Sequence, residues 1–341
     1  MQIQHKVPLS SHTTIKLGGV ATEYISCTSD QDIVDALSYA KEHNLSVHVL
    51  GGGSNTVFSD TGFNGLVIHI HTRGITSDGP LATAAAGEVW DTVVQFAIEH
   101  SLAGIECLSG IPGSVGGTPF QNVGAYGQEV AETIEYVDVI DRETGEKKRF
   151  LNSECAFAYR TSRFKTTDRD RYIITSVTFR LLPNGAASAR YPELIAALDG
   201  QDVTLLSVRN AVLTLRKKKS MVIDPSDPNC VSCGSFFTNP IVSRLLANAI
   251  PQEQGTILPQ YPAGNMEDGT PLVKLSAAWL VEHAGFPKGT RRGSVGTSSN
   301  HSLALVNMGG TSQELMAFAH EIQDTVQAKF GIRLEMEPIV V

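Results

Sequence analysis

Two glycine-rich segments have the residue types and spacing best suited to binding a ligand. The first is Gly51-Gly-Gly-Ser-Asn55, and the second covers residues 110–127, which include no charged side chain. Glycines accept positive φ and let backbone N–H groups crowd around an anion such as a phosphate. Two such loops together could enclose an extended cofactor, with N–H donors at its diphosphate and Asn or Gln amides at its ring edges. Either loop alone is also typical of an ordinary turn.

Common nucleotide-binding and hydrolase motifs do not account for these loops. The first loop follows an apolar segment but is not G-x-G-x-x-G, and residues 56–60 do not open a helix, so a Rossmann site is not indicated. The sequence contains no G-x-x-x-x-G-K-[ST] and no G-x-S-x-G. A P-loop and a hydrolase nucleophile elbow are therefore excluded.

The cysteines and histidines do not predict a metal centre. The five cysteines are scattered and odd in number, which fits free thiols in a reducing compartment. Cys230 and Cys233 form a lone C-x-x-C without the second pair of a zinc site or the helix onset of a redox motif, so we interpret it as incidental. His69 and His71 would point the same way on a strand, but they lack a third ligand. We predict no catalytic metal.

Length and charge narrow the class of protein. With 341 residues, 42% of them apolar, the chain is long enough for two or three domains with their own cores. A net charge of −8 argues against a general nucleic-acid binder and leaves anionic small molecules to local binding groups. The first residues lack the apolar core of a secretory signal, and the longest uncharged stretch, 107–128, has glycines and prolines unsuited to a membrane helix. We expect a cytoplasmic monomer without nucleic-acid or membrane partners.

The elements that must position the glycine segments follow from apolar periodicity and capping signals. Interspersed helices and strands indicate an α+β fold rather than a regular βαβ repeat. The segment 110–127 is too irregular for either element, and 221–230 is a linker with two Asp-Pro pairs. Strands are expected over residues 21–27, 46–50, 65–70, 82–86, 136–141, 148–151, 172–182 and 332–337, and helices from residue 29 and over 88–100, 202–215, 242–249, 274–284 and 312–330.

Taken together in chain order, these motifs resemble those of the UDP-N-acetylenolpyruvoylglucosamine reductase (UDP-N-acetylmuramate dehydrogenase) family, type I. Each motif is short, but the set spans nearly the whole chain. The matching stretches are 14–21, 50–55, 111–117, 121–127, 159–160, 233–240 and 334–337.

The resemblance implies a vanillyl-alcohol-oxidase-type (PCMH-type) FAD-binding fold of two α+β subdomains, followed by an α+β substrate domain. Residues 1–70 with a last strand at 331–341 would form the first FAD-binding subdomain, 71–215 the second, and 216–330 the substrate-binding domain. The implied FAD contacts are Leu50, Gly51, Gly52, Gly53, Ser54, Asn55, Ile111, Pro112, Gly113, Ser114, Gly116, Gly117, Gln121, Asn122, Gly124 and Ala125.

The resemblance also implies the reaction. FAD reduced by NADPH passes a hydride to the enolpyruvyl methylene of UDP-N-acetyl-3-O-(1-carboxyvinyl)glucosamine, giving UDP-N-acetylmuramate for peptidoglycan synthesis, and so for cell-wall growth, cell shape and division. Negative charge develops on the neighbouring carbon and its carboxylate. Such a reaction needs a fixed positive charge at the carboxylate and a proton donor for the carbon.

Three residues take these roles if the family pattern holds. Arg160 matches the carboxylate-binding arginine of the family. A guanidinium suits this role because it stays charged and forms bidentate hydrogen bonds to a carboxylate. Without the match, Arg160 would be interpreted as an ordinary surface arginine. Ser235 matches the proton donor, although Cys233 is chemically the easier acid. Glu337 matches the glutamate that stabilises the enolate, and a slip of two residues would put Glu335 there instead.

Four further residues match substrate-binding positions of the family. Tyr126, near the end of the second glycine segment, would lie near the substrate, and Tyr191 resembles the tyrosine of a loop that folds over the UDP moiety. Lys219 matches a lysine near the substrate and nicotinamide diphosphates, and Asn239 matches a substrate-binding amide. The preceding basic residues, 216–218, are expected to be a solvated face. Two other hypotheses remain: an oxidase of the same FAD fold that uses O₂, and a non-catalytic UDP-sugar binder.

Overall fold

The computed structural model describes residues 2–252 and 255–341 of the chain. They fall into two units, each with its own hydrophobic core. The first unit comprises Met1–Pro8, Val20–Ser54 and Gly62–Ile223, and the second comprises Leu9–Gly19, Asn55–Thr61 and Asp224–Val341. The finer division at residues 70 and 215 remains a prediction. No helix of the described residues is long and apolar enough to cross a bilayer.

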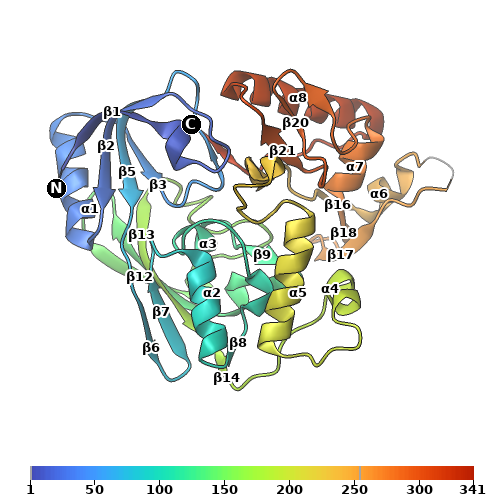
Figure 1. Cartoon of the computed structure of the whole chain (residues 1–341), viewed down its shortest axis with the longest axis horizontal. Helices are drawn as coiled ribbons and strands as arrows, with labels where there is room; N and C mark the ends of the chain where they lie inside the picture. Colours follow the sequence, from blue (N-terminus) through green and yellow to red (C-terminus); the bar gives the residue numbers. More distant parts are fainter. Residues whose placement is uncertain (1, 253–254) are drawn as a thin grey trace. The chain divides into compact units, whose positions relative to one another are not determined.

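Two larger sheets form the framework of the first unit (Figure 1). One sheet has the strand order β1 (Gln4–Pro8), β2 (Val20–Cys27), β5 (Phe63–Ile70), β3 (Val47–Leu50). In this sheet β1 and β2 are antiparallel, whereas β2, β5 and β3 are parallel to one another. The other is antiparallel, in the order β12 (Lys147–Leu151), β11 (Ile134–Asp141), β13 (Tyr172–Arg180), β7 (Leu81–Ala85), β6 (Ile75–Asp78). Two small ladders pair β9 (Gly124–Ala125) with β10 (Gln128–Glu129) and β8 (Leu102–Ala103) with β14 (Leu182–Pro183).

Two helices of this unit, α1 and α5, begin at residues whose side chains cap them. Helix α1 opens with a complete capping box, in which Ser29 Oγ accepts from Asp32 N at 3.1 Å and Asp32 Oδ2 accepts from Ser29 N at 3.1 Å. Thr204 caps α5 in the same way. The helices are α1 (Asp30–Glu42), α2 (Trp90–Glu99), α3 (Gly117–Phe120), α4 (Pro192–Ala197) and α5 (Leu205–Lys218), with 3₁₀ turns at Glu106–Leu108, Val130–Glu132 and Asn152–Glu154.

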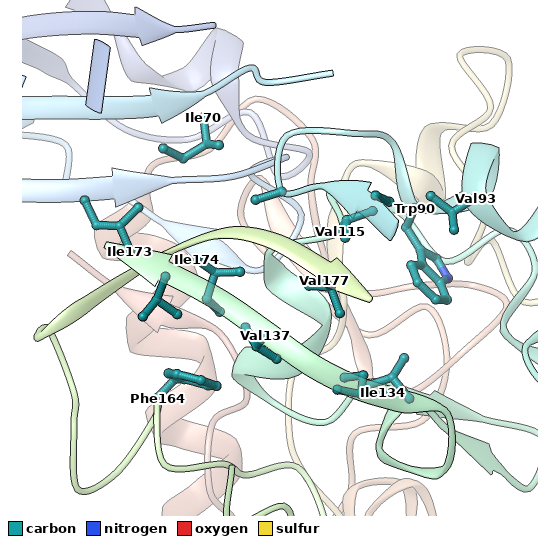
Figure 2. Packing of buried hydrophobic residues seen from close by; sticks show 14 of the residues in the cluster. Ile70, Trp90, Val93, Val115, Ile134, Val137, Phe164, Ile173, Ile174 and Val177 are labelled. Atoms are coloured by element: carbon teal, nitrogen blue, oxygen red, sulfur yellow. The ribbon is translucent and has the colours of Figure 1, made fainter. Parts of the chain in front are cut away.

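One continuous apolar cluster joins the two larger sheets of the first unit to α1 and α2. Figure 2 shows part of it: Val137 and Val177 are register partners on β11 and β13, and Trp90 of α2 belongs to the same cluster. Trp90 is fully buried, and its indole N–H donates to Leu108 O at 3.0 Å. The cluster therefore supports the chain between α2 and α3, which includes the start of the second glycine segment.

The second unit is also α+β. Its strands are β4 (Thr56–Val57), β15 (Ser232–Ser235), β16 (Ile241–Ser243), β17 (Gln260–Asn265), β18 (Pro271–Leu275), β19 (Arg291–Arg292), β20 (Val295–Thr297), β21 (Ala304–Asn307) and β22 (Ile339–Val340). They form sheets in the orders β15-β21-β20-β19, β16-β18-β17 and β22-β4. The helices are α6 (Arg244–Ala249), α7 (Ala277–His283) and α8 (Ser312–Phe330), with 3₁₀ turns at Leu9–His12 and Pro228–Cys230.

Most predicted elements are confirmed, and several differ. The predicted strand over 332–337 is wrong: only Met336 makes a bridge there, to Phe237, and the last strand is Ile339–Val340. Helix α5 continues past residue 215 to Lys218. The segment 110–127, predicted to be irregular, contains the one-turn helix α3 and strand β9. The helices predicted over 242–249 and 274–284 begin later, at Arg244 and Ala277, because the residues before them pair as strands β16 and β18.

Candidate functional site

The two glycine segments, far apart in sequence, meet in the first unit. Gly52 N donates to Ser114 Oγ at 3.1 Å, and Ser54 Oγ donates to Pro112 O at 3.0 Å. The approach requires glycine, because a Cβ on Gly52 would lie 2.7 Å from Gly113 Cα. A Cβ on Gly113, whose φ is +120°, would in turn lie 2.7 Å from Ser54 Oγ. The structure thus brings together the two loops that the sequence singled out.

The loops keep groups suited to a diphosphate. Among the described residues, the backbone N–H groups of Gly53 and Ser54 donate to no other group of the chain. A Cβ on Gly117, at the start of α3, would meet nothing within 4 Å, so there is open space beside this backbone. N–H donors without an acceptor in the first loop, and open space beside the backbone of the second, suit an anionic cofactor, so the residues present fit the diphosphate of FAD.

The other predicted cofactor residues lie around the same loops of the first unit, apart from Asn55. Leu50 is buried at the end of β3, and a Cβ on Gly116 would press on Ala86. A Cβ on Gly51 would lie 2.6 Å from Ser114 Oγ. Ile111, Pro112, Gln121, Gly124 and Ala125 are half-buried.

Arg160 is held by the second glycine segment. Its guanidinium donates to Gly124 O at 2.7 Å and to Asn122 O at 3.4 Å, and its own φ is +53°. Asn122 is buried, and its side chain donates to Glu129 Oε2 at 2.7 Å and to Ala158 O at 3.0 Å while accepting from Ala131 N at 3.1 Å. Asn122 therefore fixes the segments that carry Arg160. Arg160 is a half-buried, hydrogen-bonded cation rather than an ordinary surface arginine.

Three predicted substrate residues form a cluster in the first unit. The rings of Tyr126 and Tyr191 meet edge to face with centroids 5.8 Å apart, and Lys219 Nζ lies 5.9 Å from the centre of the Tyr126 ring. Lys219 also pairs with Glu193 at 2.5 Å. Burial raises the pKa of Tyr126 to about 12, with Arg216 opposing the shift. Glu193 had no signal in the sequence, because it meets Lys219 only through the fold.

A network that sequence reasoning missed holds the start of the second glycine segment. Asp91 accepts from Gly110 N at 2.6 Å and receives two bonds of 2.7 Å from Arg209. Arg216, expected to be solvated, is 9% exposed and donates to Gly110 O at 3.3 Å and Met221 O at 2.7 Å. Burial lowers the pKa of Arg216 to about 10, so it stays charged near neutral pH. The expectation of a solvated face is confirmed only for Lys217 and Lys218.

A second missed residue is Glu106, which is 1% exposed. Its oxygens accept from Gly104 N at 2.8 Å, Gln128 Nε2 at 3.0 Å and Ser188 N at 2.7 Å. Three donors compensate the burial of its charge. Glu106 thereby ties the chain before Tyr191 to the end of the second glycine segment.

In the second unit, Ser235 ends β15 and is half-buried. No group of the residues described here accepts from or donates to its hydroxyl, which leaves that hydroxyl available to a ligand. Cys233, the chemically easier acid, is instead 6% exposed within the apolar core, and burial raises its thiol pKa to about 12. The structure therefore favours Ser235 as the accessible donor of the two.

The backbone near Glu337 settles which glutamate lies closer in register to Ser235. Glu337 N donates to Phe236 O at 2.9 Å, whereas Glu335 O accepts from Thr238 N at 3.0 Å. Asn55 Nδ2 donates to Glu337 O at 3.2 Å. Asn55, a predicted cofactor residue, belongs to the second unit, where its amide fixes the chain at Glu337.

The remaining candidates have structural partners. Asn239 Oδ1 accepts from Ala277 N at 2.9 Å, at the first residue of α7. His69 and His71 bond to Tyr24 and Ser26, each at 2.5 Å. Within residues 2–252 and 255–341, no three His, Cys, Asp or Glu side chains gather as a metal site would require.

A profile described as FAD binding domain matches residues 21–150 of the chain. With the mixed sheets and paired glycine loops of the first unit, this match defines an FAD-binding α+β protein, as the sequence predicted.

A second profile, UDP-N-acetylenolpyruvoylglucosamine reductase, C-terminal domain, matches residues 224–341. The reductase of that name from Streptomyces coelicolor is 43% identical over 100% of this chain and 91% of its own, and the one from Mycobacterium tuberculosis is 44% identical over 99% and 95%. The crystal structure of the Thermus caldophilus reductase matches with a TM-score of 0.68 and 25% identity, over 100% of this chain and 99% of its own. The chain belongs to the UDP-N-acetylenolpyruvoylglucosamine reductase family, which confirms the resemblance found in the sequence.

Proposed function

We propose that the chain reduces UDP-N-acetyl-3-O-(1-carboxyvinyl)glucosamine to UDP-N-acetylmuramate with NADPH as co-substrate, as a cytoplasmic monomer in peptidoglycan synthesis. The observation that carries the proposal is family membership over the whole length of the chain. The paired glycine loops, with their uncommitted N–H donors, support it independently.

When bound and first reduced by NADPH, FAD would supply the hydride for the enolpyruvyl double bond. The residues we assign to FAD are the loops 50–55 and 111–125, which would hold its diphosphate by neutral backbone donors. Arg160 fits the task of binding the carboxylate on which charge develops, because two backbone carbonyls hold its guanidinium in place. Binding that strengthens as charge develops lowers the barrier.

Ser235 supplies the proton for the carbon that carries the carboxylate, next to the methylene that receives the hydride. A serine is a weak acid, so it transfers a proton only to a strongly basic carbanion that faces it directly. Its accessible hydroxyl supports this role, and the buried thiol of Cys233 does not suit it. Glu337 stabilises the developing enolate, and its backbone register beside Phe236 favours it over Glu335.

Tyr126, Tyr191 and Lys219 bind the UDP moiety. Their clustering in the first unit supports a shared ligand, with aromatic surface for an apolar face and an ammonium for a diphosphate. Asn239 contributes its amide N–H₂, since its oxygen is used by Ala277.

The test is NADPH consumption by the FAD-loaded chain with and without the enolpyruvyl sugar. We expect turnover that depends on the sugar and yields UDP-N-acetylmuramate. Rapid hydrogen peroxide production without the sugar would instead establish an oxidase. A colourless protein that binds UDP-sugar and no flavin would establish a binding protein.

A further inference from the structure

Lys219 is already engaged by an acid of its own chain. Its Nζ lies 2.5 Å from Glu193 Oε2, and the two side chains are 34% and 38% exposed. The same ammonium lies 5.9 Å from the centre of the Tyr126 ring. Glu193 follows Tyr191 by two residues, so the acid and the tyrosine belong to one short segment.

That segment is anchored to the helix that Lys219 follows. Glu193 is the second residue of α4, and Leu194 of this helix and Leu198, which follows it, pack in one cluster with Val208 and Val212 of α5. Lys219 comes directly after the last residue of α5. The apolar cluster holds the two elements together without the ion pair, so the pair can open while the elements stay in place.

We propose that Glu193 is an internal competitor that lowers the affinity of Lys219 for a nucleoside diphosphate. The proposal rests on the proposed function, in which Lys219 meets a diphosphate. A carboxylate at ion-pair distance from the ammonium repels any second anion brought to it. A diphosphate therefore binds only after Glu193 turns away, or binds against its charge.

The size of the effect follows from the exposure of the pair. Pairs that solvent reaches hold together weakly, so replacing the acid by its neutral isostere releases roughly a two- to fivefold factor in affinity. Because the interaction is screened, the gain shrinks as salt is added. A purely structural role for Glu193 predicts the opposite sign, since a weakened α4 would weaken binding.

The experiment is a calorimetric titration of the full-length, FAD-loaded chain with UDP at low salt. We expect Glu193→Gln to tighten UDP binding roughly two- to fivefold and to leave binding of uridine, which has no phosphate, unchanged. Asp30→Asn is the matched control. Asp30 of α1 forms an ion pair of 2.6 Å with Lys147 of β12, and this substitution changes the net charge by the same amount as Glu193→Gln. In a Lys219→Gln background, Glu193→Gln should change nothing.

Three results would overturn the proposal: unchanged or weaker UDP binding in Glu193→Gln, equal tightening in Asp30→Asn, or tightening that persists without Lys219. Turnover of the unaltered chain with NADPH and the enolpyruvyl sugar is measured in parallel. If that turnover is present and Glu193→Gln does not tighten binding, only this proposal fails. If the unaltered chain neither turns over nor binds UDP, the proposed function itself fails.

Discussion

Gly52 marks the closest approach of the two glycine loops, so alanine at this position tests whether the approach is required. A Cβ there would lie 2.7 Å from Gly113 Cα, 2.9 Å from Gly113 C and 3.0 Å from Ser114 N. All three are backbone atoms, so no flexible side chain can move aside. The loops must separate, and the bond from Gly52 N to Ser114 Oγ lengthens with them.

Overpacking of this kind costs about 1–3 kcal/mol. At roughly 2–4 °C per kcal/mol, the Tm of the FAD-free protein should fall by roughly 2–12 °C in Gly52→Ala. We also expect weaker FAD retention, because the N–H donors of Gly53 and Ser54 move with the loop. Both effects come from one clash, so they should appear together.

The assay is thermal unfolding of the FAD-free protein, followed by the flavin absorbance retained after gel filtration. Gly117→Ala is the matched comparison, since its Cβ would meet nothing within 4 Å of the chain and should not lower the Tm of the FAD-free protein. If Gly52→Ala unfolds at the same temperature as the unaltered protein, the close approach of the two glycine loops does not require glycine at position 52, and our account of these loops is wrong.

Three further predictions concern single side chains. Ser235→Ala should leave flavin reduction by NADPH intact and slow sugar reduction by roughly 10²- to 10⁴-fold in stopped-flow half-reactions; equal damage to both halves would contradict its role. Glu337→Gln should lower kcat far more than Glu335→Gln, and the reverse order would move the assignment by two residues. Burial tends to raise the pKa of Asp91, but hydrogen bonds from Arg209 and Gly110 outweigh it and hold that pKa below its usual value. The ionised carboxylate therefore contributes its full stabilisation above the pKa of the unfolded state. That stabilisation is lost as the pH falls through the lower pKa of the folded state. In urea unfolding at pH 7, Asp91→Asn should therefore have a lower free energy of unfolding than the unaltered protein. On acidification, the free energy of unfolding of Asp91→Asn should fall by less than that of the unaltered protein.

Local signals predicted several elements correctly because they agree with the tertiary packing. Residues 312–330 form a helix as expected, with Leu315 and Val326 buried on one face and Gly331 ending it at φ +71°. The helix from residue 30 follows from Ser29 and Asp32, whose reciprocal bonds are both formed. In such segments the capping residues and the buried stripe lie within a few turns of each other.

Other parts of the site depend on contacts between distant residues. Arg216 looks like one member of a basic run, yet its partner carbonyl at Gly110 lies more than a hundred residues away, and this contact buries it. Glu106 resembles any surface acid until Gln128 and Ser188 supply donors to it. The alternation over 332–337 indicated a strand, but only Met336 finds a bridging partner. Patterns in one segment carry no information about such partners.

The division of the second unit among separate stretches of chain also bears on how the protein is made. Its core includes Ile15, Leu17 and Val57, Asn307 bonds to Ile15 O at 3.0 Å, and β4 pairs in parallel with β22. During synthesis, residues 9–19 and 55–61 leave the ribosome long before 224–341, so they must wait without their partners. This unit can close only when residue 341 has emerged. A fragment that starts at residue 224 would lack part of its own core and expose apolar surface to aggregation.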